Sequence, residues 1–367
     1  MSARPPVAIV HDYLTQLGGA ERVVLEMTRA FPGAPLYTSM YTPDLTYPEF
    51  RDVDVRATVL NRFGPLRRHH RAAFPFLAPV FSATRVEADV VVCSSSGWAH
   101  GVRTSAPKVV YCHAIAHWLW QPDRYLGDGG SRRTAASRAA LACFTPALRH
   151  WDAHAAASAD RYLVNSTVTR DAVRRCYGID ADVLAPPLPR VDVRPDALAG
   201  ADPGFFLCVA RLLPYKNVGP VADAFAALAG ERLVVVGDGP ELARLRERAP
   251  ANVRFSRRLP DSQLRWCYEQ CAGLVAASYE DFGLTVVEAA AAGRPVVALR
   301  AGGYLDTVVD GVTGLFFAQP DAAAIAAAVR RLRSRTWDDA AIRAHAATFG
   351  ADRFDIRLRE IVADIRR

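Results

Sequence analysis

The sequence contains no CxxC pair and no group of cysteines and histidines at the spacing of a zinc site. Its seven cysteines are scattered singly, apart from Cys267 and Cys271. These absences argue against a disulfide framework and a structural zinc, and they are typical of a protein in the reducing cytosol. We therefore expect a cytoplasmic protein.

Long apolar segments are also missing. No run approaches the roughly eighteen apolar residues that span a bilayer. The first six residues, MSARPP, lack the apolar core of a signal peptide. No motif for binding DNA or RNA is present, so no nucleic-acid partner is expected. A dinucleotide-binding GxGxxG fingerprint is absent as well.

The composition is that of a folded protein with more than one core. Hydrophobic residues make up 51% and charged residues 23% of 367 residues, which predicts a globular chain with two domains. The formal net charge of +7 is compatible with an anionic partner, such as a nucleotide or an acidic membrane surface.

The stretch 62–81 begins with the densest group of basic residues, 62–71, and continues with aromatic and apolar residues. Two interpretations stay open: contact with a membrane interface or a lipid-linked substrate, at the inner face of the membrane, or a partly buried helix with an arginine-rich outer face. Pro75 and Pro79 argue against one long amphipathic helix. The residues concerned are Arg62, Arg67, Arg68, His69, His70, Arg71, Phe74, Phe76, Leu77, Val80 and Phe81.

Short, continuous apolar runs alternate with helical stretches along the chain. Such runs predict strands buried on both faces, and hence parallel sheets covered by helices. The fold class expected is α/β, with two doubly wound, Rossmann-like domains facing each other across a cleft. The predicted strands are 7–10, 90–93, 109–112, 162–164, 205–209, 233–236, 274–276 and 296–299.

The proline-rich segment around 185–203 interrupts this alternation and predicts an interdomain linker. We expect a first domain over 1–187, a linker over 188–203 and a second domain over 204–348. The last helix, 349–367, has one apolar face. We expect that face to pack against the first domain.

Glu280 and Glu288 lie eight positions apart around Phe282-Gly283. If a loop at Gly283 enters a helix near Thr285, both carboxylates flank a helix N-terminus that favours an anion such as a phosphate. The pair would then suit a ligand with a central diphosphate and hydroxyl-rich ends. The segment 285–288 is also a capping box, in which Glu288 only satisfies a backbone donor. Both interpretations stay open from these residues alone.

Two cations follow the predicted strand 205–209. Arg211 and Lys216 are spaced to clamp a diphosphate, although both could be ordinary surface cations. Asn217 could cap the next helix without any ligand. Glycine turns at 18–19, 237–239 and 302–303 also follow strands, where a backbone can approach a phosphate or sugar closely.

His113 follows the strand 109–112, at the sheet edge where ligands bind in this architecture. It could hydrogen-bond a sugar hydroxyl or carry charge near a reacting centre. Trp118 and Trp120 could stack on a sugar ring, although we expect at least one of them to pack in the core.

In this order, these segments resemble glycosyltransferase family 4, whose members are retaining, nucleotide-sugar-dependent enzymes of the GT-B fold. The resemblance covers nearly the whole chain. Within the family, the sequence is most similar to the GDP-mannose-dependent, mannosyltransferase-like branch. The segments that carry it are 18–22, 111–113, 165–166, 186–187, Arg211 with 216–217, 237–240, 280–288 and 302–303.

The resemblance implies a role for each matching residue. Arg211 and Lys216 would hold the donor diphosphate, Glu280 and His113 would contact the donor sugar, and Glu288 would hold the ribose. Together, His113, Arg211, Lys216 and Glu280 form the expected catalytic group. The expected donor-binding group is Gly18, Gly19, Phe282, Gly283, Leu284, Thr285 and Glu288, and the acceptor-side candidates are Asp12, Tyr13, His117 and Trp118.

The same resemblance implies neither metal nor cofactor, because the nucleotide-diphosphate sugar is a co-substrate. The acceptor would be a glycan, a lipid-linked molecule or a small molecule. The branch usually has His-Thr-Pro-x-Arg where this chain has His113-Ala114-Ile115-Ala116-His117. A UDP- or dTDP-sugar donor with a natural-product acceptor is therefore an alternative. A non-catalytic basic protein that binds lipid or nucleic acid is an alternative of another class.

Overall fold

The structure, a computed structural model, describes residues 4–68, 73–121, 132–190 and 192–366. The chain forms two compact units. Unit 1 comprises residues 1–187 and 351–367, and unit 2 comprises residues 188–350. Each unit contains one sheet whose strands all pair in parallel.

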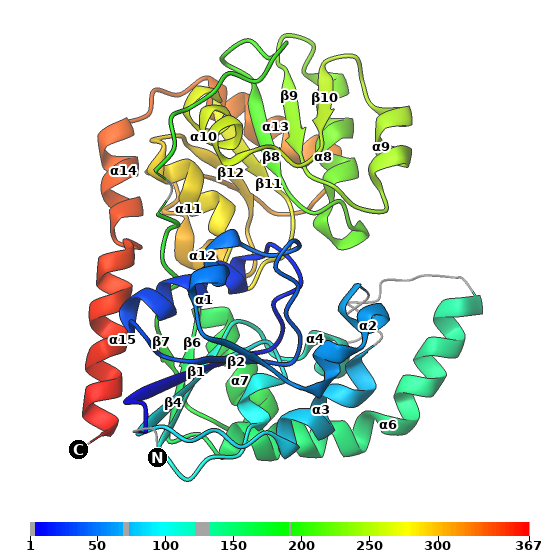
Figure 1. The fold of residues 1–367 in the computed structure, drawn as a ribbon. Helices are drawn as coiled ribbons and strands as arrows, with labels where there is room; N and C mark the ends of the chain where they lie inside the picture. Colours follow the sequence, from blue (N-terminus) through cyan, green and yellow to red (C-terminus); the bar gives the residue numbers. More distant parts are fainter. Residues whose placement is uncertain (1–3, 69–72, 122–131, 191, 367) are drawn as a thin grey trace. The chain divides into compact units, whose positions relative to one another are not determined.

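The sheet of unit 1 has seven strands in the order β3-β2-β1-β4-β5-β6-β7 (Figure 1). Its central strands are continuous Val-rich segments that are buried throughout. The strands are β1 (Val7–His11), β2 (Leu36–Thr38), β3 (Val55–Ala57), β4 (Val90–Ser95), β5 (Lys108–Cys112), β6 (Arg161–Val164) and β7 (Asp182–Val183).

Alternate residues of β1 pack into different clusters on the two faces of this sheet. Val7 and Ile9 contribute to the cluster with α1 and α15, whereas Ala8 and Val10 contribute to the cluster with α3. Burial on both faces explains why the strand is apolar at every position. The helices of unit 1 are α1 (Gly19–Ala30), α2 (Gly64–Arg68), α3 (Phe74–Ala83), α4 (His117–Trp120), α6 (Arg132–Ala157), α7 (Thr167–Tyr177) and α15 (Ala351–Ile365).

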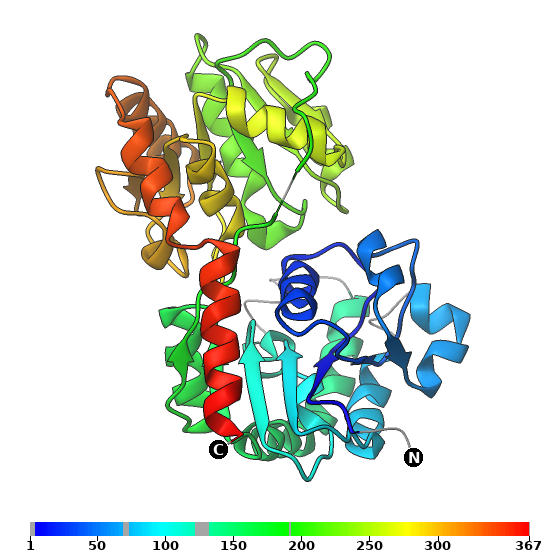
Figure 2. The ribbon, with the colours of Figure 1, turned by 60° about the vertical axis from the view of Figure 1, so that its left-hand side comes forward.

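The last helix, α15, belongs to unit 1 although the chain reaches it from unit 2. Phe354 packs edge-on against Tyr111 of β5, with ring centroids 5.7 Å apart. Arg359 donates from Nε to the carbonyl oxygen of Ala30, at the end of α1, over 2.8 Å. Figure 2 shows the helix alongside the sheet of this unit.

The sheet of unit 2 has six strands in the order β10-β9-β8-β11-β12-β13. The strands are β8 (Phe206–Val209), β9 (Leu233–Val236), β10 (Val253–Ser256), β11 (Gly273–Ala276), β12 (Val296–Leu299) and β13 (Gly314–Phe317). The helices are α8 (Val218–Ala224), α9 (Leu242–Arg248), α10 (Asp261–Gln270), α11 (Leu284–Ala291), α12 (Tyr304–Thr307), α13 (Ala322–Arg333) and α14 (Asp339–Ala347).

Several helices begin at residues that favour this position. Ser166 caps α7 by accepting from the backbone N–H of Thr169, and Asp321 and Asp338 cap α13 and α14 in the same way. Helix α7 ends at Gly178, which adopts the left-handed conformation with φ of 71°.

All eight predicted strands are present, and the prediction of two parallel, Rossmann-like sheets is confirmed. The expected linker segment forms no helix or strand among its described residues. It is nevertheless attached to unit 2, because Arg265 donates to the carbonyl oxygen of Val193 and Arg254 to that of Ala199.

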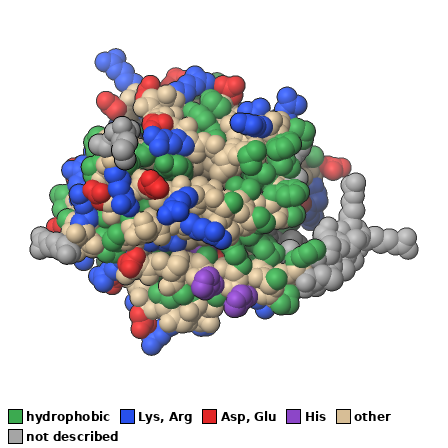
Figure 3. All heavy atoms as spheres, turned by 60° about the horizontal axis from the view of Figure 1, so that its bottom comes forward, with side chains coloured by type: hydrophobic (Ala, Val, Ile, Leu, Met, Phe, Trp, Pro, Cys, Tyr) green, Lys and Arg blue, Asp and Glu red, His purple; other side chains and the backbone are tan. Residues whose placement is uncertain are grey.

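The basic stretch 62–81 contains helix α2 and most of helix α3, with Pro75 at the start of α3 and Pro79 inside it. His69, His70 and Arg71 lie outside the described residues. Phe63 and Phe76 are more than half exposed, while Leu77 and Phe81 are buried in the core. Figure 3 shows basic, acidic and hydrophobic side chains interspersed over one face of the molecule.

No helix in the described ranges is both long and apolar enough to cross a bilayer.

Candidate active site

Lys216 and Glu280 meet at the carboxyl edge of the sheet in unit 2. Lys216 lies in the turn after β8, and Glu280 lies in the loop between β11 and α11. The Lys216 Nζ atom donates to Glu280 Oε1 over 2.5 Å. The lysine side chain is 10% exposed and the glutamate 25% exposed, so the pair is part-buried but open to a ligand.

Two residues that the sequence analysis did not select fix the Glu280 carboxylate. Ser278 Oγ also donates to Glu280 Oε1 over 2.5 Å, and Ser278 Oγ lies 3.1 Å from Tyr304 Oη. Tyr304 is buried, and desolvation together with the nearby Glu280 raises the pKa of its phenol well above the ordinary value. The phenol therefore stays protonated and available as a hydrogen-bond donor.

Helix α11 begins at Leu284, one residue earlier than expected. Gly283 is its N-cap residue, with φ of 95°, and no side chain caps the helix. Thr285 lies inside the first turn, so the capping box predicted for 285–288 is wrong. A side chain at Gly283 would also meet the Tyr304 ring, because a Cβ there would lie 2.5 Å from Tyr304 Cε1.

The loop just before α11 has an apolar anchor. Phe282 is buried and packs edge-on against Phe349, with centroids 5.7 Å apart. The backbone from 282 to 285 is thereby fixed at a helix N-terminus, where N–H groups favour an anion.

Glu288 does not cap α11; its carboxylate forms a hydrogen bond with a residue of α10 instead. Tyr268 Oη donates to Glu288 Oε2 over 2.6 Å. Glu288 is partly exposed, as a ligand-binding carboxylate must be. No motif or spacing in the sequence marks Tyr268, which is a further residue of the site.

Arg211 is exposed at the end of β8, and its Nη2 lies 3.4 Å from Tyr215 Oη. Lys216 Nζ lies 5.1 Å from the centroid of the Tyr215 ring, within cation–π range. Asn217 occupies the N-cap position of α8, but its side chain does not cap the helix. It donates instead to the carbonyl oxygen of Ala277 over 2.9 Å, which ties this turn to the end of β11.

At the glycine turns of unit 2, the backbone of one loop lies close to the backbone of a neighbouring loop. A Cβ at Gly302 would lie 2.4 Å from the carbonyl oxygen of Glu280, and a Cβ at Gly237 would lie 1.9 Å from that of Ala210. Gly303 N donates to the carbonyl oxygen of Glu280 over 2.8 Å. These close approaches support the loops that carry Glu280 and Arg211, and they explain the glycines without any ligand contact.

In unit 1, His113 lies just beyond β5 and is 9% exposed. Its Nε2 atom lies 2.7 Å from Ser94 Oγ, at the end of β4. Burial, with a smaller contribution from the nearby His11, lowers the pKa of His113 to about 3. His113 is therefore a neutral imidazole at physiological pH.

His11, at the end of β1, completes a row of three side chains with Ser94 and His113. Its Nδ1 atom lies 3.0 Å from Ser94 Oγ. Its Nε2 atom lies 4.0 Å from Glu21 Oε1 in the first turn of α1, which is ion-pair rather than hydrogen-bond distance. His11 and Ser94 were not selected from the sequence, although each ends a predicted strand as His113 does.

Gly18 is the N-cap residue of α1, and Gly19 is its exposed first residue. A Cβ at Gly18 would lie 2.3 Å from Glu21 Oε2. The missing side chain at Gly18 thus makes room for the buried Glu21 carboxylate.

Two of the four acceptor-side candidates, Asp12 and Trp118, are buried within unit 1. Both oxygens of the buried Asp12 carboxylate accept backbone N–H groups, from Ser96 and Ala99, each over 2.6 Å. Trp118 is 9% exposed and stacks on Trp98, with centroids 5.0 Å apart. Asp12 therefore orders the loop after β4, and Trp118 packs in the core instead of presenting a ring face to a sugar.

Tyr13 and His117 are the two partly exposed candidates. His117 is the first residue of α4. Trp120, at the other end of α4, donates from Nε1 to the buried Asp152 over 2.6 Å. The short helix is thus pinned at one end while His117 stays accessible at the other.

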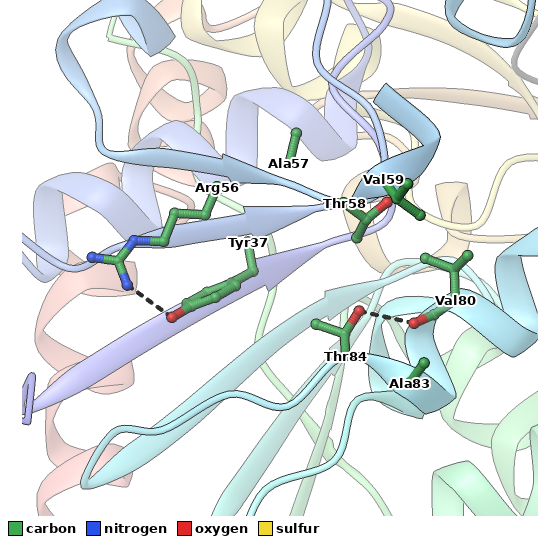
Figure 4. A pocket seen from close by; sticks show the side chains of 8 residues that line it. All are labelled: Tyr37, Arg56, Ala57, Thr58, Val59, Val80, Ala83 and Thr84. Atoms are coloured by element: carbon green, nitrogen blue, oxygen red, sulfur yellow. Dashed lines mark hydrogen bonds between the residues drawn. The ribbon is translucent and has the colours of Figure 1, made fainter. Parts of the chain in front are cut away.

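A separate open pocket of about 380 Å³ lies in unit 1 (Figure 4). The Arg56 guanidinium donates to Tyr37 Oη over 2.9 Å at one side of it. Val59, Val80 and Ala83 supply apolar walls, and none of the predicted site residues lines it.

Comparison with known proteins assigns a family region to each unit. Residues 17–186 match the model described as Glycosyltransferase Family 4, and residues 192–347 match that described as Glycosyl transferases group 1. Anabaena HepE in complex with UDP-glucose has a similar structure, with a TM-score of 0.69 at 18% identity, covering 98% of this chain and 99% of that one.

Two relatives illustrate the range of sequence similarity. The alpha-1,3/1,6-mannosyltransferase ALG2 of Dictyostelium discoideum is 25% identical over 374 residues, covering 84% of this chain and 85% of that protein. The GDP-mannose-dependent alpha-(1-6)-phosphatidylinositol monomannoside mannosyltransferase of Mycolicibacterium smegmatis is 34% identical over 173 residues, covering 41% and 44%.

The chain spans only 33–53% of the length of the first curated relatives that it matches. The two family regions nevertheless fall on the two units and follow one another along the chain. Two glycosyltransferase family models thus match the two units in turn, and with its two parallel, Rossmann-like sheets the chain has the GT-B fold.

Proposed function

We propose that this protein is a glycosyltransferase of family 4 that transfers a hexose from a nucleotide-diphosphate sugar to a hydroxyl group of a glycan or a lipid-linked acceptor. GDP-mannose is the first candidate donor. The observation that carries the proposal is the contact between Lys216 and Glu280, which puts a cation and a carboxylate together beside the N-terminus of α11. The cation can bind the diphosphate of the donor, and the carboxylate can accept hydrogen bonds from the hydroxyl groups of its sugar.

Each site residue has a role in this proposal. Lys216 and Arg211 bind the diphosphate and stabilise the charge that develops as the leaving group departs. Glu280 accepts from the hydroxyl groups of the donor sugar, and Glu288 accepts from those of the ribose. The backbone at 282–285 and the glycines at 18–19 complete the donor site, and His113 contacts the donor sugar.

The proposed reaction retains the anomeric configuration. The departing phosphate takes the proton of the acceptor hydroxyl on the same face of the sugar, so the protein supplies position and electrostatic stabilisation instead of a strong base. Lys216 and the N–H groups at the start of α11 supply the positive charge for a reaction that requires no metal ion.

The choice of GDP-mannose is supported by relatives that carry this donor or mannosyl transfer in their names. The UDP-glucose bound to HepE supports the competing assignment, a UDP- or dTDP-sugar donor with a natural-product acceptor. A lipid-linked acceptor is supported by the stretch 62–81, in which Phe63 and Phe76 are exposed, as are the basic residues Arg62 and Arg68. We propose that this surface contacts the inner face of the membrane from the cytoplasm.

Thermal stabilisation by nucleoside diphosphates tests the donor proposal. A ligand that binds the folded state raises the melting temperature by mass action. We expect GDP to stabilise the protein more than UDP, dTDP or ADP at equal concentration, and we expect Glu288→Ala to remove the response. Selective stabilisation by UDP or dTDP would transfer the proposal to the competing donor.

The proposal of a different class is a basic protein that binds lipid or nucleic acid without catalysis. No thermal response to any nucleotide, together with binding to anionic vesicles, would favour that class over the transferase. A mass-spectrometric screen of donor and acceptor pairs then identifies the sugar and the acceptor.

A further inference from the structure

The orientation of His11 is fixed by an acceptor that cannot donate. His11 Nδ1 lies 3.2 Å from the carbonyl oxygen of Ser94 as well as 3.0 Å from Ser94 Oγ. A carbonyl oxygen only accepts hydrogen bonds, so Nδ1 of His11 carries a proton that points at Ser94.

That proton determines how the Ser94 hydroxyl is used. Because Ser94 Oγ accepts from His11, its own proton is available for the next neighbour, His113 Nε2, at 2.7 Å. His113 Nε2 then accepts, and the single proton of this neutral imidazole must lie on Nδ1. Nδ1 of His113 makes no hydrogen bond to the described part of the chain.

Glu21 supplies a buried counter-charge behind His11. Its side chain is 1% exposed, and its Oε2 atom has no hydrogen-bond partner among the described residues. Burial lowers the pKa of His11, but the carboxylates of Glu21 and Asp12 outweigh it, and the pKa is raised above 6.5. The other titratable group that faces His11 is His113, whose ring centroid lies 6.4 Å away.

We propose that Glu21, His11 and Ser94 form a buried relay that holds His113 as the tautomer protonated on Nδ1, so that this atom donates a hydrogen bond to the donor sugar. The inference rests on the proposed function for its last step, the contact with the sugar. His11, Ser94 and Glu21 are positioning residues, since they act through His113.

The Glu21 carboxylate favours the protonated form of His11, and this form allows only one direction for the hydrogen bonds from His11 through Ser94 to His113. An imidazolium at His11 donates from both nitrogens, so Ser94 can only pass its proton towards His113. A neutral His11 with its proton on Nε2 would accept at Nδ1 instead. Ser94 would then turn back towards His11, and His113 would carry its proton on Nε2, with no proton left on Nδ1 for a ligand.

Nitrogen-15 NMR of the full-length protein with labelled histidine reads both states directly. The nine histidines include His11 and His113, which are assigned by their loss in His11→Asn and His113→Asn variants. We expect His113 to be neutral and protonated on Nδ1 at pH 6, and His11 to be protonated on both nitrogens with a midpoint above 6.5.

Two variants distinguish a role of these residues in the relay from a role only in packing. Ser94→Ala removes the shared hydroxyl, and we expect a mixture of His113 tautomers with turnover lowered about tenfold, the value of one hydrogen bond. Glu21→Gln keeps the shape, and we expect a lower midpoint for His11 and mixed tautomers at pH 7. Glu26→Gln is the matched control on the same helix, because the buried Glu26 pairs with Arg29; neither histidine signal should change.

His113 protonated on Nε2 in the wild-type protein would overturn the relay, and so would an unchanged tautomer in Ser94→Ala. These results do not depend on catalysis. If the expected tautomer is found but no nucleotide sugar binds, the proposed function fails while the relay stands. If a nucleotide sugar binds and is turned over equally by Ser94→Ala, the contact of His113 with the sugar is wrong.

Discussion

Lys216 and Glu280 are 64 positions apart in the chain, yet Lys216 Nζ donates to Glu280 Oε1 over 2.5 Å. Their strands, β8 and β11, are neighbours in the sheet, with Leu207 in register with Leu274. Parallel neighbours end at the same edge, so the loops that follow them meet. The pair is therefore a direct consequence of strand order.

Replacing Lys216 with alanine should lower turnover by about two to three orders of magnitude, because a preorganised cation at the developing diphosphate charge is lost. Glu288→Ala should have a comparable effect. Steady-state kinetics with the donor identified by the mass-spectrometric screen measures both. Arg244→Ala is the control, since Arg244 is exposed and pairs with Glu241 on α9; its turnover should match the wild type. Near-normal transfer by both site variants would contradict the assignment.

Gly302→Ala should destabilise the protein and impair donor binding. The position has φ of 65°, and the added Cβ would lie 2.4 Å from the Glu280 carbonyl oxygen. The expected cost is about 1–3 kcal/mol, seen as a melting temperature several degrees lower. Gly230→Ala is the matched control, because nothing lies within 4 Å of its Cβ position. Equal melting temperatures for the two variants would show that the close approach is not needed.

Stability should fall as the pH decreases from 6.5 towards 3. Burial lowers the pKa of His113 to about 3, so in this window the unfolded chain binds a proton that the folded chain does not. The contribution of His113 is at most about 1.4 kcal/mol per pH unit. Urea titrations of the wild type and His113→Asn across this range measure it, and the variant should lose less stability on acidification. Identical pH profiles would exclude a buried neutral His113.

The same measurement above pH 6.5 reports on His11. Its pKa is raised in the folded state, so the stabilisation by its protonated form is complete below 6.5 and disappears as the pH rises through the folded value. Glu21→Gln should flatten that decrease, whereas Glu26→Gln should keep it.

Turnover should be unchanged by a chelator, because Lys216 and the start of α11 supply the positive charge in the proposed reaction. Kinetics after treatment with EDTA, with and without added Mg²⁺ or Mn²⁺, test this expectation. A loss of activity that a divalent cation restores would contradict the metal-independent proposal.

The sequence predicted the central strands but not the outer ones. The missed strands are β2, β3, β7, β10 and β13, and four of them are the edges of the two sheets. An edge strand such as β7, Asp182–Val183, is exposed at both residues, so it produces no continuous apolar run. Central strands produce such runs because helices cover both of their faces.

In the proposed site, the sequence pattern marked the charged residues but not the side chains that form hydrogen bonds to them. Tyr268 and Ser278 contact the predicted glutamates, and Tyr304 contacts Ser278, yet a lone serine or tyrosine carries no spacing that marks it. Trp118 and Asp12 were candidates for contacting the acceptor, but Trp118 stacks on Trp98 and Asp12 accepts backbone hydrogen bonds. Such contacts depend on packing between distant segments.

Helix α15 makes the first unit depend on a segment that is synthesised only after the whole second unit. Phe354, Leu358, Ile361 and Val362 belong to the same buried cluster as Val109 and Tyr111 of β5. Until residues 351–365 emerge, one face of the first sheet exposes the apolar surface that this helix later covers. The second unit lies in the chain between the two segments of the first unit, so it can complete its own core before α15 is synthesised. During synthesis the sheet of unit 1 is therefore completed after that of unit 2, and a fragment ending at residue 187 would have to receive helix α15 as a separate peptide.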